Sequence, residues 1–273
     1  MGLRNSCVAL TFHAVAPWAA APSPLVEPAA ARYAVGCERF AGALEAVRAE
    51  SCCTAAEYVQ KSSGDWRVLT FDDGLVTDYD IVLPMLLCRA VRATFFVTAE
   101  CIGRPGYTSA AQLKEMAAAG MEIASHGLTH RYLVTMPRRD AIREIRHSKE
   151  RIQEMVGVEV GSFAPVGGHF HRWMLAEAAE AGYRAFATMI PGRSRQATGL
   201  TVLRRNHVQS HHDAAYVSRL LRGHPGQLLL NRVRYSLLKL PKDLLGLGNY
   251  DALKDIIVGT VRNGSAGPVI SRG

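Results

Sequence analysis

Two adjacent aspartates are the first residues of this chain with an evident chemical use. Asp72 and Asp73 follow the apolar run Arg67 to Phe71, and Gly74 then allows the backbone to turn sharply. Because neighbouring residues at the end of a strand point in different directions, one carboxylate is predicted to bind a cation. The other is predicted to face a substrate water as a general base. A simple turn or helix-capping pair is the alternative interpretation.

Two histidines four residues apart form the second such group. His126 and His130 follow the run Glu122 to Ser125, and on a helical turn this spacing would put both imidazoles on one side. Together with one carboxylate they make a three-ligand set with an open position for water, which suits zinc or a similar divalent metal. Surface polar histidines are the alternative interpretation.

The elements that must position these residues alternate between strands and helices. Runs rich in apolar and β-branched residues predict strands at Cys7 to His13, Arg67 to Phe71, Ala93 to Val97, Glu122 to Ser125, Ser162 to Ala164, Ala185 to Thr188 and Thr201 to Asn206. Helical patterns fall at Glu38 to Ala49, Tyr79 to Ala90, Ser109 to Ala119, Arg139 to Met155 and Arg172 to Ala181.

This order predicts an α/β fold, a distorted (β/α) barrel of about seven parallel strands with extra C-terminal helices. An open doubly wound sheet is the alternative. In a barrel the carboxyl ends of the strands meet on one face, so the Asp pair and the His pair are expected to converge there. We expect one catalytic domain over residues 1–262, with its helical C-terminal part at about 213–262, and a disordered tail at 263–273.

The segments Thr70-Phe71-Asp72-Asp73-Gly74 and Ser125-His126-Gly127-Leu128-Thr129-His130 resemble the first two motifs of the polysaccharide deacetylase family, carbohydrate esterase family 4. The resemblance runs from about Val8 to His207. It implies a distorted (β/α) barrel with a divalent metal, usually zinc, and hydrolysis of N-acetyl groups in chitin, peptidoglycan and related glycans. By position it implies that Asp72 is the catalytic base and that Asp73, His126 and His130 bind the metal.

The remaining motifs of that family match less closely. His13 ends a first strand like that of many members, and the segment from Phe163 to Gly168 resembles the third motif, which lines the substrate groove. The resemblance therefore implies substrate contacts by His13, Pro165, Gly167 and His169. However, the arginine that orients the base near this motif is absent, and the late Leu-x-His motif has no clean counterpart. His207 is our candidate for the missing general acid, with His169 and His171 as alternatives.

Composition limits the partners and the compartment. The chain has 48% hydrophobic residues, a net charge of +8 and a pI near 9.4, which suggests an anionic partner. Six cysteines without metal-binding spacing fit a reducing cytoplasm. The start of the chain does not resemble a secretory signal, and no apolar run is long enough to span a bilayer. The dispersed basic residues argue against nucleic acid as a partner.

The C-terminal region contains a basic amphipathic pattern. Leu230, Val233, Leu237, Leu240 and Leu244 recur at helical intervals, with Arg232, Arg234, Lys239 and Lys242 between them. We expect these leucines to pack over the barrel. The alternative is peripheral contact with an anionic membrane, at the inner membrane face, where a lipid-linked substrate would be presented.

The sequence as a whole favours a metal-dependent hydrolase that removes an N-acetyl group from an amino sugar in a glycan, a lipid-linked or a nucleotide-linked intermediate. A deformylase, or another amide or ester hydrolase that uses the same metal site, is a second interpretation. A catalytically silent carbohydrate-binding protein is a third.

Overall fold

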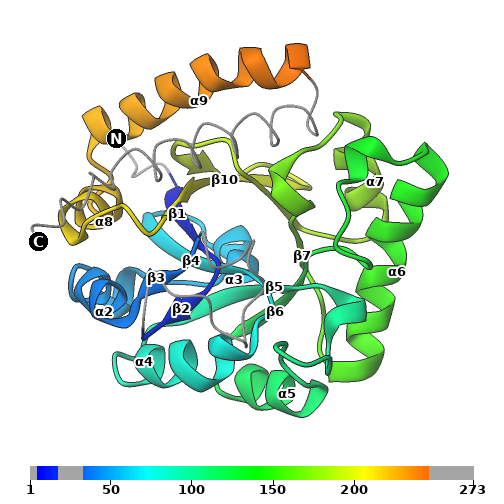
Figure 1. The fold of residues 1–273 in the computed structure, drawn as a ribbon, viewed down its shortest axis with the longest axis horizontal. Coiled ribbons are helices and arrows are strands. Elements are labelled where there is room, and N and C mark those ends of the chain that lie inside the picture. Colours follow the sequence, from blue (N-terminus) through cyan, green and yellow to red (C-terminus); the bar gives the residue numbers. More distant parts are fainter. Residues whose placement is uncertain (1–4, 18–32, 246–273) are drawn as a thin grey trace, which may run out of the picture. The chain divides into compact units, whose positions relative to one another are not determined.

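The computed structural model describes residues 5–17 and 33–245, with side chains as far as residue 237. Seven parallel strands form a closed barrel (Figure 1), in the order β1, β4, β5, β6, β7, β8 and β10, and β10 closes it by pairing in parallel with β1. Their bounds are β1 (Ser6–Phe12), β4 (Asp65–Asp73), β5 (Ala93–Val97), β6 (Glu122–Ser125), β7 (Ser162–Phe163), β8 (Ala185–Thr188) and β10 (Thr201–His207). The expected distorted (β/α) barrel is therefore confirmed.

Alternate residues of each strand point into the barrel, and small or flat side chains fill its interior. This inner cluster includes Ala9, Val68, Phe96, Ala124 and Leu203. The residues between them face outward to the helices and form the larger core cluster. The barrel is thus a packed core, and its strand ends are the place left for function.

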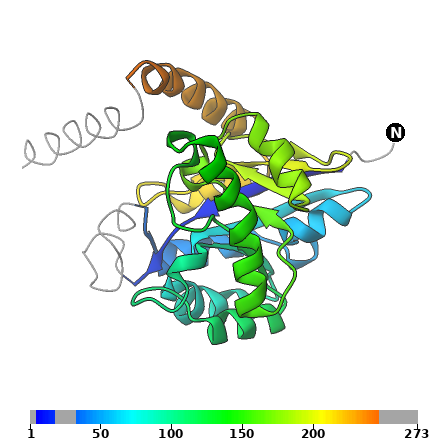
Figure 2. The ribbon, with the colours of Figure 1, turned by 90° about the vertical axis from the view of Figure 1, so that its right-hand side faces the viewer.

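Helices cover the outside of the barrel (Figures 1 and 2). They are α2 (Cys37–Glu45), α3 (Ala55–Gln60), α4 (Leu83–Leu87), α5 (Ala110–Ala118), α6 (Arg138–Val156), α7 (Trp173–Glu180) and α8 (Ala214–Leu221). A last helix, α9 (Pro225–Leu245), follows α8 in the chain. A π-helical turn, η2 (Asp78–Val82), leads into α4, and 3₁₀ turns lie at η1 (Ala49–Ser51), η3 (Ala99–Cys101), η4 (Leu133–Thr135) and η5 (Val166–Gly168). Short strands β2 (Val15–Ala16) and β3 (Val35–Gly36) pair with each other, and β9 (Ser194–Arg195) runs antiparallel to β1.

All seven predicted strands are present, with ends that differ by at most two residues from the predicted ones. The predicted helices are also present, although the one at Tyr79 to Ala90 is divided between η2 and α4. Helix α3 is not among the predicted helices, although its complete capping box between Thr54 and Glu57 is a signal readable in the sequence.

The chain divides into two compact units, Met1–Leu229 and Leu230–Gly273, and the boundary falls inside α9. The first unit holds the barrel. The expected tail at 263–273, the last part of the expected helical region and most of the segment before Tyr33 lie outside the described residues. No helix in the described part of the chain has both the length and the apolar character needed to cross a bilayer.

Candidate active site

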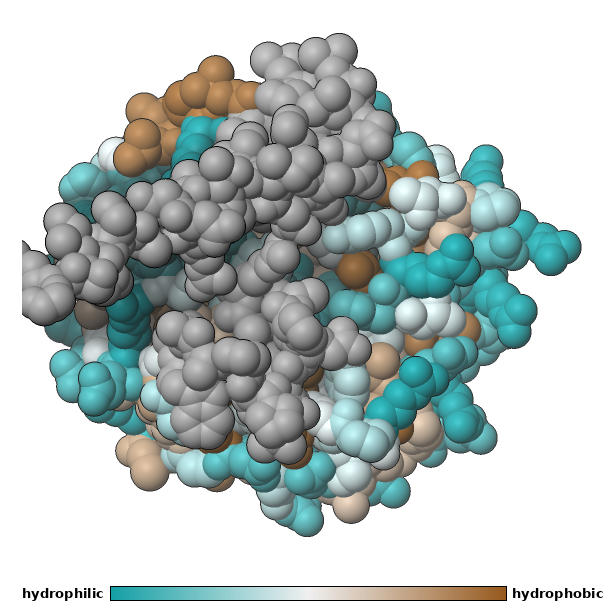
Figure 3. All heavy atoms as spheres, viewed as in Figure 1, coloured by the Kyte–Doolittle hydropathy of each residue, from teal (hydrophilic) through white to brown (hydrophobic). Residues whose placement is uncertain are grey.

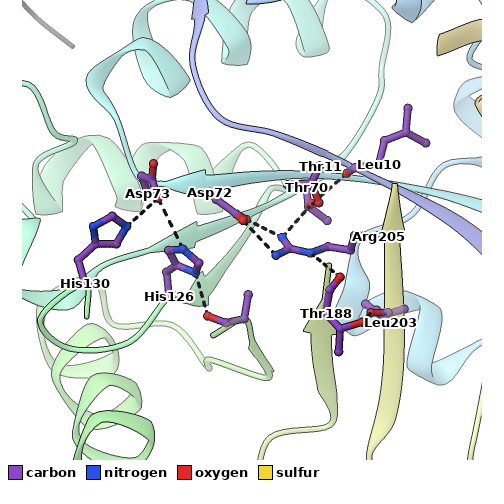
Figure 4. Close-up of polar contacts among 11 residues, drawn as sticks. Leu10, Thr11, Thr70, Asp72, Asp73, His126, His130, Thr188, Leu203 and Arg205 are labelled. Atoms are coloured by element: carbon purple, nitrogen blue, oxygen red, sulfur yellow. Dashed lines mark hydrogen bonds and ion pairs between the residues drawn. The ribbon is translucent and has the colours of Figure 1, made fainter. Parts of the chain in front are cut away.

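The two adjacent aspartates point to different parts of the site, as the sequence predicts for neighbouring strand residues. Asp72 and Asp73 are the last two residues of β4, and both are buried. Figure 4 shows Asp73 directed toward two histidines and Asp72 directed into the barrel toward Arg205. The left-handed backbone of Asp73, with φ of 81°, accompanies this divergence.

Asp73, His126 and His130 form the only cluster of three potential metal ligands in the described part of the chain, with donor atoms within 4.8 Å of one another. The Asp73 Oδ1 atom lies 2.9 Å from His130 Nε2 and 3.5 Å from His126 Nε2. His126 is buried, whereas the His130 side chain is 36% exposed. The cluster is therefore reached from solvent on the His130 side.

The hydrogen bonds of His126 fit a metal ligand. Its Nδ1 lies 2.8 Å from the Ala164 carbonyl oxygen, so Nδ1 must carry the proton and donate it. Burial lowers the pKa of His126, against the charges of Asp72 and Asp73, so the ring is neutral near pH 7. The Nε2 lone pair then faces the Asp73 carboxylate, and a cation between them would remove this repulsion. The residues thus suit a divalent metal with one carboxylate and two imidazole ligands.

The two histidines are brought together by a loop, and the expectation of a helical turn is wrong. Residues 126–130 follow β6 as an irregular bend, with positive φ at Gly127 (89°) and at His130 (60°). Glu144 of α6 holds this loop: its Oε2 accepts hydrogen bonds from the backbone of Leu128 (2.7 Å) and Thr129 (3.0 Å). Its Oε1 accepts a third bond from the Thr129 hydroxyl. Two main-chain donors and a buried carboxylate therefore set the position of His130.

Arg205 supplies the partner of Asp72 that sequence comparison leaves open. The guanidinium donates from Nη1 to Asp72 Oδ1 (2.5 Å) and from Nη2 to Oδ2 (3.0 Å), and the Arg205 side chain is fully buried. Further donors reach the Thr70 hydroxyl (3.3 Å) and the Thr188 carbonyl (3.4 Å). Burial by itself would raise the pKa of Asp72, but the charge and hydrogen bonds of Arg205, together with the nearby imidazoles of His126 and His13, keep that pKa below its usual value. Asp72 is consequently an ionised, oriented carboxylate.

Arg205 is far from the third motif, where the family resemblance led us to expect the orienting arginine, and it was therefore not predicted. It comes from β10, where Leu203, Arg205 and His207 alternate and therefore share the inner side of the strand. An arginine between two inward-facing residues must meet a buried countercharge, and this was the available signal.

His13 and His207 lie together beside this pair. Thr11 of β1 is in register with His207 of β10, and the rings of His13 and His207 have centroids 5.0 Å apart. Tyr33 stacks on His13 at 5.0 Å and lies 5.2 Å from His207. His13 directly follows β1 and His207 ends β10, so these rings lie at the carboxyl end of the barrel strands, as Asp72 does.

The third-motif residues lie at the end of β7, the strand between β6 and β8. Pro165 precedes the turn η5, where Gly167 has φ of 66°. A Cβ atom on Gly167 would lie 2.6 Å from the Tyr132 ring, and that ring in turn meets His169 with centroids 5.8 Å apart. The glycine is required for this close approach. The structure thus brings the predicted residues to the carboxyl ends of the strands, and it leaves their contacts with a substrate as predictions.

One further acid near the site was not singled out from the sequence. Asp78 at the start of η2 is fully buried, and neither of its carboxylate oxygens has a hydrogen-bond partner among the described residues. Burial, together with the negative charges of Asp73 and Asp72, raises its pKa well above the usual value. These surroundings favour the neutral form of the carboxyl group.

The class of protein is defined by a closed β/α barrel that has, at its strand ends, three potential metal ligands and a carboxylate paired with an arginine. The polysaccharide deacetylase family model matches residues 60–186, which include all four residues of the first two motifs. A Bacillus subtilis protein named as a polysaccharide deacetylase, YxkH, is 28% identical over 146 residues. That match covers 54% of this chain and 52% of the relative, so the chain spans about half the length of the curated relative. Over residues 60–186, the chain is thus similar to the polysaccharide deacetylase family.

Solved structures support the fold. The Streptococcus pyogenes deacetylase PplD matches with a TM-score of 0.69 and 23% identity, over 81% of this chain and 98% of that one. The Bacillus cereus polysaccharide deacetylase BC0361 matches with a TM-score of 0.68 and 18% identity, over 80% of this chain and 69% of that one. Arg205 and His207 lie beyond the segment that the family model matches.

Proposed function

We propose that this protein is a metal-dependent hydrolase that removes an N-acetyl group from an amino sugar in a glycan, a lipid-linked or a nucleotide-linked intermediate. The observation that carries the proposal is that the two aspartates at the end of β4 have different partners. Asp73 lies in a cluster with two histidines, whereas Asp72 is paired with Arg205, which favours its ionised form. A silent carbohydrate-binding protein would not need a buried arginine to keep a second carboxylate charged.

A divalent metal held by Asp73, His126 and His130, for which zinc is our choice, would acidify a water and polarise the amide carbonyl. Asp72 would accept a proton from the attacking water, since its carboxylate is ionised and its position is set by two hydrogen bonds. Breaking the C–N bond then leaves acetate and requires a proton on the departing amine. The overall reaction consumes one water and yields acetate and the free amino sugar.

We propose that His207 is the general acid that donates a proton to the departing amine. Its place at the carboxyl end of β10, two residues after Arg205, puts it on the same inner side of the strand as the base partner. His13 and Tyr33 pack against its ring and would restrict its orientation. His13, Pro165, Gly167 and His169 are the proposed sugar contacts.

Our proposals for the acyl group and for the cellular compartment have separate reasons. Acetyl is proposed because the family is named for deacetylation, and the Streptococcus pyogenes relative was solved with acetate. We also propose a cytoplasmic location, because all six cysteines are free and reducing compartments keep thiols in that state.

Acetate release across N-acetylhexosamines in polymeric, lipid-linked and nucleotide-linked form tests the proposal. The protein would be stripped of metal and then reloaded with zinc, cobalt or manganese. Release that depends on metal and is lost in Asp72→Asn supports the proposal. Release without metal would contradict it, and formate release from N-formyl analogues in place of acetate would reassign the acyl group.

A further inference from the structure

The first half of α9 exposes an apolar stripe. Leu229, Leu230, Val233 and Leu237 are 65%, 61%, 46% and 64% exposed, and they make up four of the six large exposed hydrophobic residues in the described part of the chain. Leu229 and Leu230 are adjacent, and the other spacings of three, four, seven and eight residues place all four side chains within about 100° on one side of the helix. Figure 3 shows hydrophobic side chains at the upper left, where Figure 1 places the start of α9.

Leu230, Val233 and Leu237 are thus exposed in the described part of the chain, where the sequence led us to expect buried side chains. Leu228 is the α9 residue that belongs to the core cluster, at 9% exposure, and it points away from the stripe that begins one residue later. The side chains of Leu240 and Leu244, which have the same spacing, lie outside the described residues. An apolar side that faces water is unusual in a soluble protein and marks an interaction surface.

Basic residues border the stripe. Arg232 and Arg234 are the two neighbours of Val233, so they project about 100° to either side of it. Over its length α9 contains Arg232, Arg234, Lys239 and Lys242 and a single acid, Asp243. Long basic side chains beside an apolar strip can reach anionic head groups while the strip enters the acyl boundary.

We propose that α9 binds the surface of an anionic membrane, with the stripe buried at the interface and its arginines against lipid phosphates. A second copy of the chain is a poorer partner, because apposed copies of this helix would bring like charges together within a protein of net charge +8. An anionic bilayer satisfies both the apolar stripe and the positive borders. The proposal does not depend on the reaction catalysed.

Flotation with vesicles measures this binding directly. The full chain should float with vesicles of phosphatidylglycerol and phosphatidylcholine at low ionic strength, should float poorly with phosphatidylcholine alone, and should be released by salt. The double variant Leu230→Ser/Leu237→Ser should bind at least about tenfold more weakly. Because both side chains are exposed, this variant should unfold at the same temperature as the wild type.

Leu87→Ser is the matched control, since Leu87 of α4 is 48% exposed and lies outside α9. It should bind vesicles as the wild type does. The double variant Arg232→Gln/Arg234→Gln should lose the preference for anionic lipid. Equal binding to neutral and anionic vesicles, undiminished binding by the leucine variant, or no binding at low ionic strength would each overturn the proposal. So would a dimer in light scattering that the leucine variant dissociates, together with absence of flotation.

Discussion

Arg205 and Asp72 form a bidentate ion pair inside the barrel, with side chains that are 0% and 3% exposed. The two residues are 133 positions apart, at the ends of β10 and β4, and the strand between them in space is β1. Phe96 lies under the guanidinium, with the Arg205 Cζ atom 5.1 Å from the ring centroid. The pair holds the proposed base in one orientation and favours its ionised form. A residue of the barrel interior thereby sets the state of a carboxylate at the strand ends.

Arg205→Met should lower kcat about a hundredfold, because an unheld Asp72 no longer presents its carboxylate to the attacking water. The acid limb of the pH profile should also move to higher pH, since loss of the guanidinium charge removes what keeps the pKa of Asp72 low. Steady-state kinetics over pH would show both effects.

The variant also leaves a buried carboxylate unpaired, at a cost of about 3–5 kcal/mol, so its folding must be checked by circular dichroism. Arg205→Lys retains the charge without the paired donors and should give an intermediate loss of kcat with a smaller shift of the acid limb. Arg151→Met, in an exposed pair with Glu154, is the matched control. An acid limb unmoved in both Arg205 variants would show that Asp72 does not set it.

His130→Ala and Asp73→Asn should abolish stoichiometric metal binding, because each removes one of three ligands from the cluster. Metal content after dialysis, measured by atomic emission, checks this. His147→Ala removes an exposed histidine of α6 that pairs with Glu150, and it should retain the metal. Full metal content in both ligand variants would place the metal elsewhere.

Glu144→Gln should weaken metal affinity about 10–100-fold, because it disturbs the three hydrogen bonds that hold the loop before His130. The expected kinetic signature is recovery of kcat at high metal concentration. Titration calorimetry with zinc measures the affinity. Glu150→Gln on the same helix is the control, and equal affinities for the two variants would show that the loop is held by other contacts.

His207→Gln should lower kcat by about 10²–10⁴-fold on an amino-sugar amide, because a general acid is required for an amine leaving group. The loss should shrink on an aryl amide such as N-acetyl-4-nitroaniline, whose leaving group needs little protonation. His13→Gln is the control. It changes the ring that packs against His207 but leaves the proposed general acid in place, so it distinguishes an effect of packing from an effect of proton transfer. The same loss on both substrates would assign His207 to positioning, and a leaving-group-dependent loss in His13→Gln would move the role to His13.

Asp78→Asn should stabilise the protein at neutral pH. The folded-state pKa of Asp78 is raised, so above its unfolded pKa the folded protein retains a proton that the unfolded chain releases, and stability falls as pH rises. The amide mimics the neutral acid without this penalty. We expect a rise in Tm of at least about 2 °C at pH 7 that diminishes toward pH 4, measured by calorimetry. A lower Tm across this range would mean that the carboxylate has a partner in solution.

Local patterns in the sequence determined the strands and the four residues of the first two motifs. The apolar, β-branched runs that predict strands are buried on both faces of a parallel barrel, so burial and propensity agree at each of them. Asp72, Asp73, His126 and His130 were identifiable because two short segments with chemistry both follow such runs, and a barrel brings its strand ends together.

Tertiary structure decided what depends on distant partners. Arg205 becomes the partner of Asp72 only because β10 closes the barrel against β1, and no local spacing encodes a contact across 133 positions. The left-handed backbone at His130 depends on Glu144, which is contributed by a different element. The periodicity of α9 identifies its apolar side, but only packing could show that this side faces solvent, because a helical pattern is the same whether it faces a core or a membrane.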